Sequence, residues 1–206
     1  MRSKLMLAVV VAALAWAAAA LYQQSNWKIV NNPPPAGPIV ALGDSLTFGF
    51  GADKGGSYPE QLGKLIGRAV VNRGVNGDKI ADAAARLDKD VLALKPSIVI
   101  ILLGGNDILT QQPMDQSFKT LEGIVRRVQG RGAMVVLVGL RVIAPVGGVG
   151  ARYHKLARQT GCLFVDDILD DIYGQRSLMS DQIHPNTKGY KIMAERVAGK
   201  LKPYIK

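Results

Sequence analysis

The sequence predicts an α/β domain built around a parallel β-sheet. Short apolar runs alternate with longer segments in which apolar residues recur at helical spacing. The run Ile-Val-Ile-Ile-Leu-Leu at 98–103 is apolar on both faces, which is typical of a central strand covered by helices on each side. This strand–helix alternation implies parallel strands joined by right-handed crossovers.

The strands are predicted from short apolar runs bounded by turn residues or proline. In chain order the five predicted strands are residues 38–42, 69–72, 97–103, 133–138 and 162–165.

The helices are predicted from apolar positions three and four residues apart. The first begins at Ser57 as N-cap, with Glu60 completing a capping box, and the second stops before Pro96. In chain order the predicted helices are residues 57–66, 80–94, 115–130, 151–160 and 187–201.

The composition excludes several classes of protein. The chain has 206 residues, 48% of them hydrophobic and 20% charged, which fits one globular domain and excludes wholesale disorder. Cys162 is the only cysteine, so no disulfide can form within the chain. With only His154 and His184 beside it, a zinc site of His and Cys is nearly excluded, and we expect no cofactor or metal.

The first 38 residues differ from the rest of the chain. Arg2 and Lys4 precede an uncharged run at 5–22 that is mostly Ala, Leu and Val. This pattern indicates either a cleaved signal peptide or a retained membrane anchor. Residues 23–38 are proline-rich and predict an extended spacer, followed by a domain at 39–206. For a bacterial chain we expect a place in the cell envelope, in the periplasm or anchored to the inner membrane.

The net charge of +10 has two interpretations. The commoner is a soluble basic surface, and the other is attraction to an anionic partner such as lipid headgroups. We expect no nucleic-acid partner, because the basic residues are scattered and aromatic residues are only 6% of the chain. The oligomeric state stays open.

Four polar blocks lie where parallel α/β enzymes carry their reacting groups, at the carboxyl ends of strands or in the loop before the last helix. Three follow predicted strands: Gly-Asp-Ser-Leu-Thr at 43–47, Asn-Arg-Gly-Val-Asn-Gly at 72–77 and Gly-Gly-Asn-Asp at 104–107. The fourth, Asp-Gln-Ile-His-Pro-Asn at 181–186, precedes the last helix. Each block alone is a common turn, but the four together are improbable by chance.

The four blocks resemble those of the SGNH (GDSL-type) hydrolases, over about residues 39–201. The resemblance implies a three-layer α/β/α sandwich with a five-stranded parallel sheet of flavodoxin-like type, in agreement with the strands above. Within this family, the sequence most resembles the arylesterase, acyl-CoA thioesterase I and lysophospholipase L1 branch. The segment 140–150 is shorter and richer in glycine than in the thioesterase branch, which leaves the substrate open.

The resemblance also implies a set of site residues. A serine needs a base to become a nucleophile, so Ser45 would pair with His184, which Asp181 would orient from three residues away. The oxyanion hole would consist of the backbone N–H groups of Ser45 and Gly74 and the side-chain amide of Asn106. No G-x-S-x-G elbow occurs anywhere in the chain.

The function expected from these residues is a serine esterase. It would hydrolyse short- to medium-chain acyl esters or thioesters, with lysophospholipids possible at an anionic membrane. The alternatives are a carbohydrate O-acetylesterase and a membrane-tethered binding module without catalysis. Among the remaining candidates, Asp44 is expected to orient the serine loop and His154 to lie on a helix surface. The pairs at 166–167 and 170–171 are expected at helix ends or on the surface.

Overall fold

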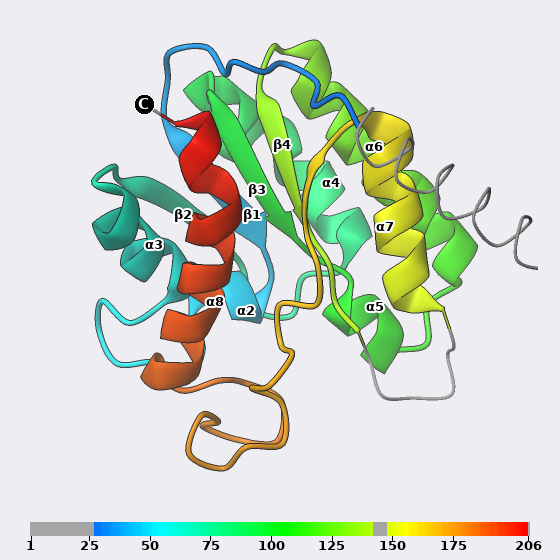
Figure 1. Cartoon of the computed structure of the whole chain (residues 1–206). Coiled ribbons are helices and arrows are strands. Elements are labelled where there is room, and N and C mark those ends of the chain that lie inside the picture. Colours follow the sequence, from blue (N-terminus) through cyan, green and yellow to red (C-terminus); the bar gives the residue numbers. More distant parts are fainter. Residues whose placement is uncertain (1–26, 142–147, 206) are drawn as a thin grey trace, which may run out of the picture.

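In a computed structural model of the chain, the structure describes residues 27–141 and 148–205. They form a three-layer sandwich around one five-stranded sheet, in which every pair of neighbouring strands is parallel and the order is β2-β1-β3-β4-β5 (Figure 1). This confirms the predicted fold class. The strands are β1 Ile39–Gly43, β2 Val70–Gly74, β3 Ile98–Leu102, β4 Met134–Val138 and β5 Leu163–Val165.

Helices cover both faces of this sheet. Helix α3 packs against α8 on one face, and α6 packs against α4 and α7 on the other. The longer helices are α3 Tyr58–Ile66, α4 Ile80–Asp90, α6 Met114–Gly130, α7 Val149–Thr160 and α8 Thr187–Leu201. The short ones are α2 Ser45–Phe48, α5 Gly105–Leu109 and the 3₁₀ turns η1 Leu92–Leu94 and η2 Lys202–Tyr204.

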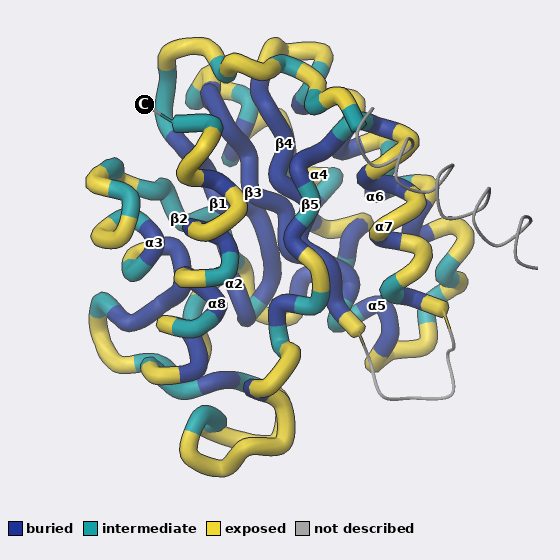
Figure 2. The backbone as a smooth tube through the Cα atoms, in the orientation of Figure 1, coloured by how far each residue is buried: buried dark blue, intermediate teal, exposed yellow. Residues whose placement is uncertain are grey.

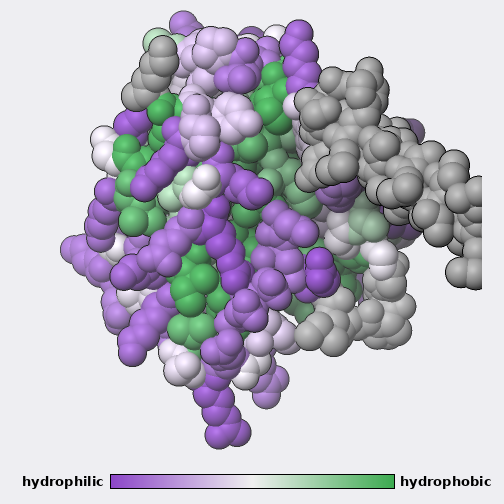
Figure 3. Space-filling model, viewed as in Figure 1, coloured by the Kyte–Doolittle hydropathy of each residue, from purple (hydrophilic) through white to green (hydrophobic). Residues whose placement is uncertain are grey.

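The core lies between the sheet and the two helical layers. All residues of β1, β3 and β4 are buried, because helices cover them on both sides, while the outer surface of the helices is exposed (Figure 2). Hydrophilic side chains cover most of the face that carries α3 and α8, with apolar patches between them (Figure 3). The doubly apolar run that predicted a central strand is β3, which pairs with β1 and β4.

The helix predicted at 80–94 is shorter than expected. Helix α4 ends at Asp90, and residues 92–94 form the 3₁₀ turn η1. Lys95 then adopts a left-handed φ of 49°. Because proline disfavours a helical conformation in the residue before it, Pro96 ends the helical turn at this point.

Two short helices were not predicted, and each begins within one of the polar blocks. Helices α2 and α5 have only four and five residues, too few for apolar periodicity to reveal them. The block at 104–107 was expected only as a polar segment that follows a strand. In the structure Gly104 is the N-cap, so Asn106 lies inside α5.

The described chain begins with a segment that lies on the domain, the N-terminal strap (residues 27–38). Trp27 Nε1 donates to the carbonyl of Cys162 at 3.0 Å, and the side chain of Asn31 donates to the carbonyls of Gln129 and Ala133, both at 2.9 Å. The predicted spacer is therefore in contact with the domain over this part, because its polar groups find partners there. The run at 5–22 lies outside the described residues.

The strap crosses the end of the molecule where the parallel strands begin. Its partners precede β4 and β5, and Figure 1 shows it with the C-terminus at one end while α2 and α5 lie at the other. Within the described ranges, the helices lack the combination of length and apolarity that crossing a bilayer requires.

Candidate active site

Ser45 lies where the chain turns out of β1 into the short helix α2. Asp44 caps this helix, because its Oδ1 accepts the N–H of Leu46 at 3.0 Å. The turn needs glycine at position 43, since a Cβ there would collide with the side chain of Thr47 and with the carbonyl of Leu102. The hydroxyl of Ser45 is thus presented at the carboxyl end of the sheet.

The structure brings three of the predicted site residues together. Oγ of Ser45 lies 3.0 Å from Nε2 of His184, and Nδ1 of the same ring lies 2.8 Å from Oδ2 of Asp181. Oδ1 of Asp181 accepts the backbone N–H groups of Ile183 and His184, each at 2.7 Å. The hydrogen bonds from His184 and the N–H of Ile183 lower the pKa of Asp181 to about 2, so its carboxylate stays ionised.

Hydrogen bonds on both sides fix the loop that carries His184. The N–H and hydroxyl of Ser180 donate to the carbonyl of His184, at 2.9 and 3.0 Å. Asn186 caps α8 by accepting two backbone N–H groups, and its amide donates back to the carbonyl of Ser177. The ring of Phe50 lies 4.6 Å from the imidazole, between centroids. The loop hydrogen bonds and the contact with the Phe50 ring therefore both restrict the position of the imidazole.

The predicted oxyanion donors are only partly available. The N–H of Gly74 donates to Oδ1 of Asn72 at 2.9 Å, so it is already used within the end of β2. The prediction of Gly74 as a donor would require this hydrogen bond to break. Glycine is required at position 74 for packing, because a Cβ there would meet the backbone of Phe48.

The side-chain amide of Asn106 is held next to the loop that follows β2. Its Nδ2 donates to the carbonyl of Asp78 at 2.9 Å, which leaves its second hydrogen for another acceptor. In that loop Gly77 is exposed and has a φ of +81°, which favours glycine. Within the described chain, the N–H groups of Ser45 and Gly77 have no protein acceptor.

Arg86 was not among the predicted site residues, yet it links the strand ends of the site. Its guanidinium donates to the carbonyls of Gly43 and Arg73, at 3.1 and 3.0 Å, and its Nε lies 2.7 Å from Oδ2 of Asp78. The signal in the sequence was an arginine beside Leu87, on the helix face that packs inward. Arg86 therefore links β1, β2 and the loop that holds Asn106.

Two acidic side chains of the polar blocks are buried. Burial raises the pKa of Asp44 to about 7, against the opposing effects of the Leu46 N–H and the nearby His184. Asp107 accepts the N–H of Ile80 at 3.0 Å and the hydroxyl of Ser117 at 2.6 Å. Asp44 thus supports the serine turn, as expected, and Asp107 joins α5 to the starts of α4 and α6.

An apolar pocket of about 120 Å³ adjoins these residues. Chain neighbours of three site residues contribute to it: Leu46 follows Ser45, Gly105 precedes Asn106 and Ile183 precedes His184. The other lining residues are Ile108, Leu109, Leu140, Arg141, Leu169 and Tyr173. Part of the glycine-rich segment at 140–150, residues 142–147, lies outside the described residues.

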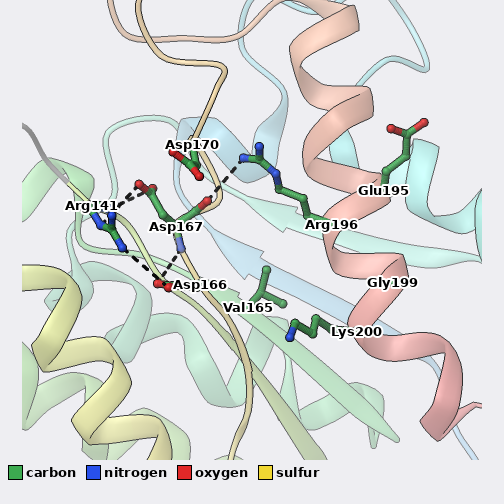
Figure 4. A pocket seen from close by; sticks show the side chains of 9 residues that line it. All are labelled: Arg141, Val165, Asp166, Asp167, Asp170, Glu195, Arg196, Gly199 and Lys200. Atoms are coloured by element: carbon green, nitrogen blue, oxygen red, sulfur yellow. Dashed lines mark hydrogen bonds and ion pairs between the residues drawn. The ribbon is translucent and has the colours of Figure 1, made fainter.

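A larger cavity of about 470 Å³ lies between β5 and α8 and is lined mainly by charged side chains (Figure 4). Arg141 pairs there with Asp166 and Asp167, at 3.8 and 3.9 Å. Asp166 and Asp167 directly follow β5, and Asp170 and Asp171 lie in the turns after them, so none of the four is at a helix end. Asp166, Asp170 and Asp171 are exposed, which agrees with the surface position that was the other expectation. Among the described residues, no group of three or more His, Cys, Asp or Glu side chains could hold a metal ion.

The second histidine lies apart from this constellation. His154 is exposed on α7, and its ring meets Trp27 and Phe164 edge-on at 5.4 and 5.7 Å. This confirms the expected surface position. His184 is therefore the histidine that contacts Ser45.

The chain is similar in sequence to proteins named as esterases and thioesterases. The chain is 29% identical over 178 residues to thioesterase 1/protease 1/lysophospholipase L1 of Escherichia coli, covering 82% of this chain and 86% of that protein. It is 28% identical over 162 residues to an acetylxylan esterase of Geobacillus stearothermophilus, covering 66% and 71%.

A solved structure shows the same arrangement of chain. The crystal structure of TesA superposes with a TM-score of 0.77 at 28% identity, covering 82% of this chain and 99% of that one. Residues 41–192 match the family described as GDSL-like lipase/acylhydrolase. The chain therefore belongs to the GDSL-like lipase/acylhydrolase family and is a carboxylic ester hydrolase.

Proposed function

We propose that this hydrolase is a serine esterase that acts through an acyl-enzyme, with Ser45 as nucleophile, His184 as base and Asp181 as its orienting carboxylate. The observation that carries the proposal is the unbroken chain of contacts from Ser45 through His184 to Asp181, at 3.0 and 2.8 Å. Nε2 accepts the hydroxyl proton as Oγ attacks the ester carbonyl, and then delivers it to the leaving alcohol. The ionised Asp181 stabilises the imidazolium in between.

The oxyanion of the tetrahedral intermediate needs donors fixed in advance. We assign this role to the N–H of Ser45, the free hydrogen of the Asn106 amide and the N–H of Gly77. Gly77 replaces Gly74 in the assignment, because the N–H of Gly74 donates to Asn72, while Gly77 is exposed and its N–H has no acceptor among the described residues. Water then hydrolyses the acyl-enzyme, with His184 again as base.

The pocket beside Ser45 supports short acyl groups as substrates. Its volume of about 120 Å³ is smaller than an engineered cavity of about 150 Å³ that binds benzene. An acyl chain of up to about six carbons therefore fills the described pocket. Longer chains gain nothing further from it, because each CH₂ contributes about 0.8 kcal/mol only while it is buried.

A carbohydrate O-acetylesterase is the second candidate function. The specific observation in its favour is the small size of the pocket, which suits an acetyl group. The similarity to an acetylxylan esterase is consistent with it. The two candidates share their chemistry and differ in the alcohol side of the ester.

A fluorophosphonate probe tests the chemistry. Such a probe phosphonylates an activated serine, so mass spectrometry of the full chain should find the adduct on Ser45 and none in a His184→Gln variant. A catalytically silent binding module would give no adduct in the wild-type chain, and that result would refute the proposal.

For location, we propose that residues 1–22 place the domain in the cell envelope. The support is the uncharged run at 5–22 behind Arg2 and Lys4. Fractionation with an antibody against the C-terminus tests this. Recovery in a salt-resistant membrane pellet supports an anchor, and a soluble periplasmic chain starting between 17 and 26 supports cleavage. A cytoplasmic chain starting at Met1 would refute both.

A further inference from the structure

Charge is distributed unevenly between the two ends of this domain. In a parallel α/β fold, the carboxyl ends of the strands and the amino ends of the helices meet at the same end of the molecule. Most of the 16 acidic residues follow a strand or begin a helix, and so lie at the end that carries Ser45. They are Asp44, Asp53, Glu60, Asp78, Asp82, Asp107, Asp115, Asp166, Asp167, Asp170, Asp171 and Asp181.

The opposite end is positively charged. Six exposed basic residues lie in the strap, at the carboxyl ends of helices or just before strands. Together they form the basic end: Lys28, Lys95, Arg131, Arg158, Lys200 and Lys202. Three acidic residues of the neighbouring helix turns are paired: Asp88 with Arg127, Asp90 with Arg86 and Glu122 with Arg126.

The dipole of each helix accounts for some of these cations, because a helix carboxyl end favours positive charge. It does not account for Lys28, which lies in the strap outside any helix. The basic end therefore carries an excess of positive charge, with Asp166 as an acidic neighbour in the cavity that Trp27 and Lys200 line.

The apolar N-terminal run joins the molecule at this same end. Trp27, at the start of the described strap, contacts the turn before β5 and lies beside Lys200 in one cavity. Only four residues separate it from the uncharged run at 5–22. Fully extended, they span at most about 17 Å. Any membrane that holds residues 5–22 therefore lies close to the basic end.

We infer that the basic end docks on an anionic lipid surface, with the active site facing away from it. Each basic residue near such a surface raises the binding constant about fivefold. Helix α6 has 17 residues and places the two ends about 25 Å apart. That distance is several times the Debye length of about 8 Å at physiological ionic strength, so acidic residues at the far end of α6 do not cancel the attraction. Asp166 and Glu195, which share a cavity with Lys200, reduce it locally.

This orientation, which rests on the proposed anchoring but not on the proposed chemistry, defines how substrate arrives. Ser45 opens toward the aqueous phase, so its esters come from solution or from a polymer beyond the membrane. Lipids in the bilayer that holds the domain are out of reach. Acylated glycans and soluble esters therefore fit better than lysophospholipids.

The two ends of α6 give a direct test of orientation. Asp115, in its first turn, and Arg131, at its carboxyl end, are both exposed. Each is replaced by cysteine in the full chain and labelled with a fluorophore. Native Cys162 does not interfere, because it is buried and burial raises the pKa of its thiol to about 12. The chains are reconstituted in vesicles of phosphatidylcholine with 30% phosphatidylglycerol that carry a quencher on their headgroups.

We expect at least threefold stronger quenching at Arg131→Cys than at Asp115→Cys, with the difference lost in pure phosphatidylcholine or in 1 M salt. A Lys95→Glu, Arg158→Glu, Lys202→Glu variant should lose the difference. A variant with the same charge change at the active-site end, Lys54→Glu, Lys119→Glu, Lys188→Glu, should keep it.

Three results would overturn the inference. Equal quenching at both positions would mean that the domain tumbles freely, and stronger quenching at Asp115→Cys would mean the opposite orientation. Loss of the difference on adding a low concentration of duplex DNA would assign the basic end to nucleic acid. If the chain does not bind the vesicles, the anchoring proposal also fails. Ester hydrolysis in the same samples reports on the chemistry separately.

Discussion

Nε2 of His184 lies 3.0 Å from Oγ of Ser45, although 139 residues separate the two in the chain. The contact predicts that replacing Ser45 by alanine removes the nucleophile and lowers kcat on p-nitrophenyl acetate by at least about 10³. Ser57 provides the control, because its hydroxyl bonds only to Glu60 at the start of α3. Ser57→Ala should keep its activity and lose about 1 kcal/mol of stability. A Ser45→Ala enzyme near the wild-type rate would end the assignment.

The two histidines should differ sharply. His184→Gln should lower kcat by about 10³ or more, because in the described part of the chain no other base contacts Ser45. His154→Gln should keep wild-type kcat, since its ring contacts Trp27 and Phe164 on the far side of the domain. Steady-state kinetics of both variants decide between them, and the reverse pattern would mean that the wrong histidine has been chosen.

The sequence predicted Ser45, His184 and Asp181 because their blocks resemble those of the SGNH hydrolases and because the predicted topology supports that placement. Parallel strands bring the residues that follow them to one edge, and a three-residue spacing allows Asp181 to reach the imidazole. The oxyanion donors depend instead on individual hydrogen bonds. The bond from the N–H of Gly74 to Asn72 is formed by a side-chain rotamer, which apolar patterning cannot reveal.

Asp44 should make stability depend on pH. Burial raises its pKa to about 7, above its ordinary value of 3.8, so the folded chain disfavours the ionised form. Below about pH 4 Asp44 is protonated in both the folded and the unfolded chain, and the free energy of unfolding is not reduced by its burial. As the pH rises from about 4 to about 7, the unfolded chain ionises while the folded chain holds the proton, so the free energy of unfolding falls. Asp44→Asn, which keeps an acceptor for the Leu46 N–H, should therefore gain stability relative to wild type with rising pH, by at most about 4 kcal/mol at pH 8.

Thermal unfolding of both chains at pH 5 and pH 8 measures this effect. The Tm difference should move in favour of Asp44→Asn at the higher pH. An equal loss at both values would show that Asp44 acts only through packing and hydrogen bonding.

Arg86 should act as a positioning residue. Arg86→Lys keeps the charge but cannot reach both strand carbonyls and Asp78 at once, so the loop that holds Asn106 loosens. We expect kcat to fall about tenfold with little change in KM. Arg127→Lys is the matched control, because its ion pair with Asp88 is exposed and contributes at most about 1 kcal/mol. A purely structural role for Arg86 would lower the Tm and leave kcat unchanged.

The role of Arg86 and the path of the strap show what the sequence could not predict. Both depend on long side chains or irregular backbone that reach partners far along the chain, such as Asn31 with Gln129. Apolar periodicity describes which face of an element is buried, but not which carbonyl at the sheet edge a polar group will find. The strands were predictable because each is buried on both faces or bounded by turn residues.

The pocket of about 120 Å³ predicts the acyl-chain preference. On p-nitrophenyl esters from C2 to C16, kcat/KM should rise while added methylene groups are buried, peak at about C4 to C6 and fall beyond.

Leu109 and Ile183 line this pocket and are more than 40% exposed, so they can be changed with little effect on the core. Leu109→Ala should enlarge the pocket and shift the maximum toward longer chains, whereas Leu65→Ala, an exposed leucine on α3, should leave the profile unchanged. A wild-type maximum at C16 would contradict the short-acyl assignment, and activity confined to acetylated xylan would favour the O-acetylesterase. In either case the mechanism at Ser45 would stand, because the pocket selects the acyl group while His184 and Asp181 activate the serine.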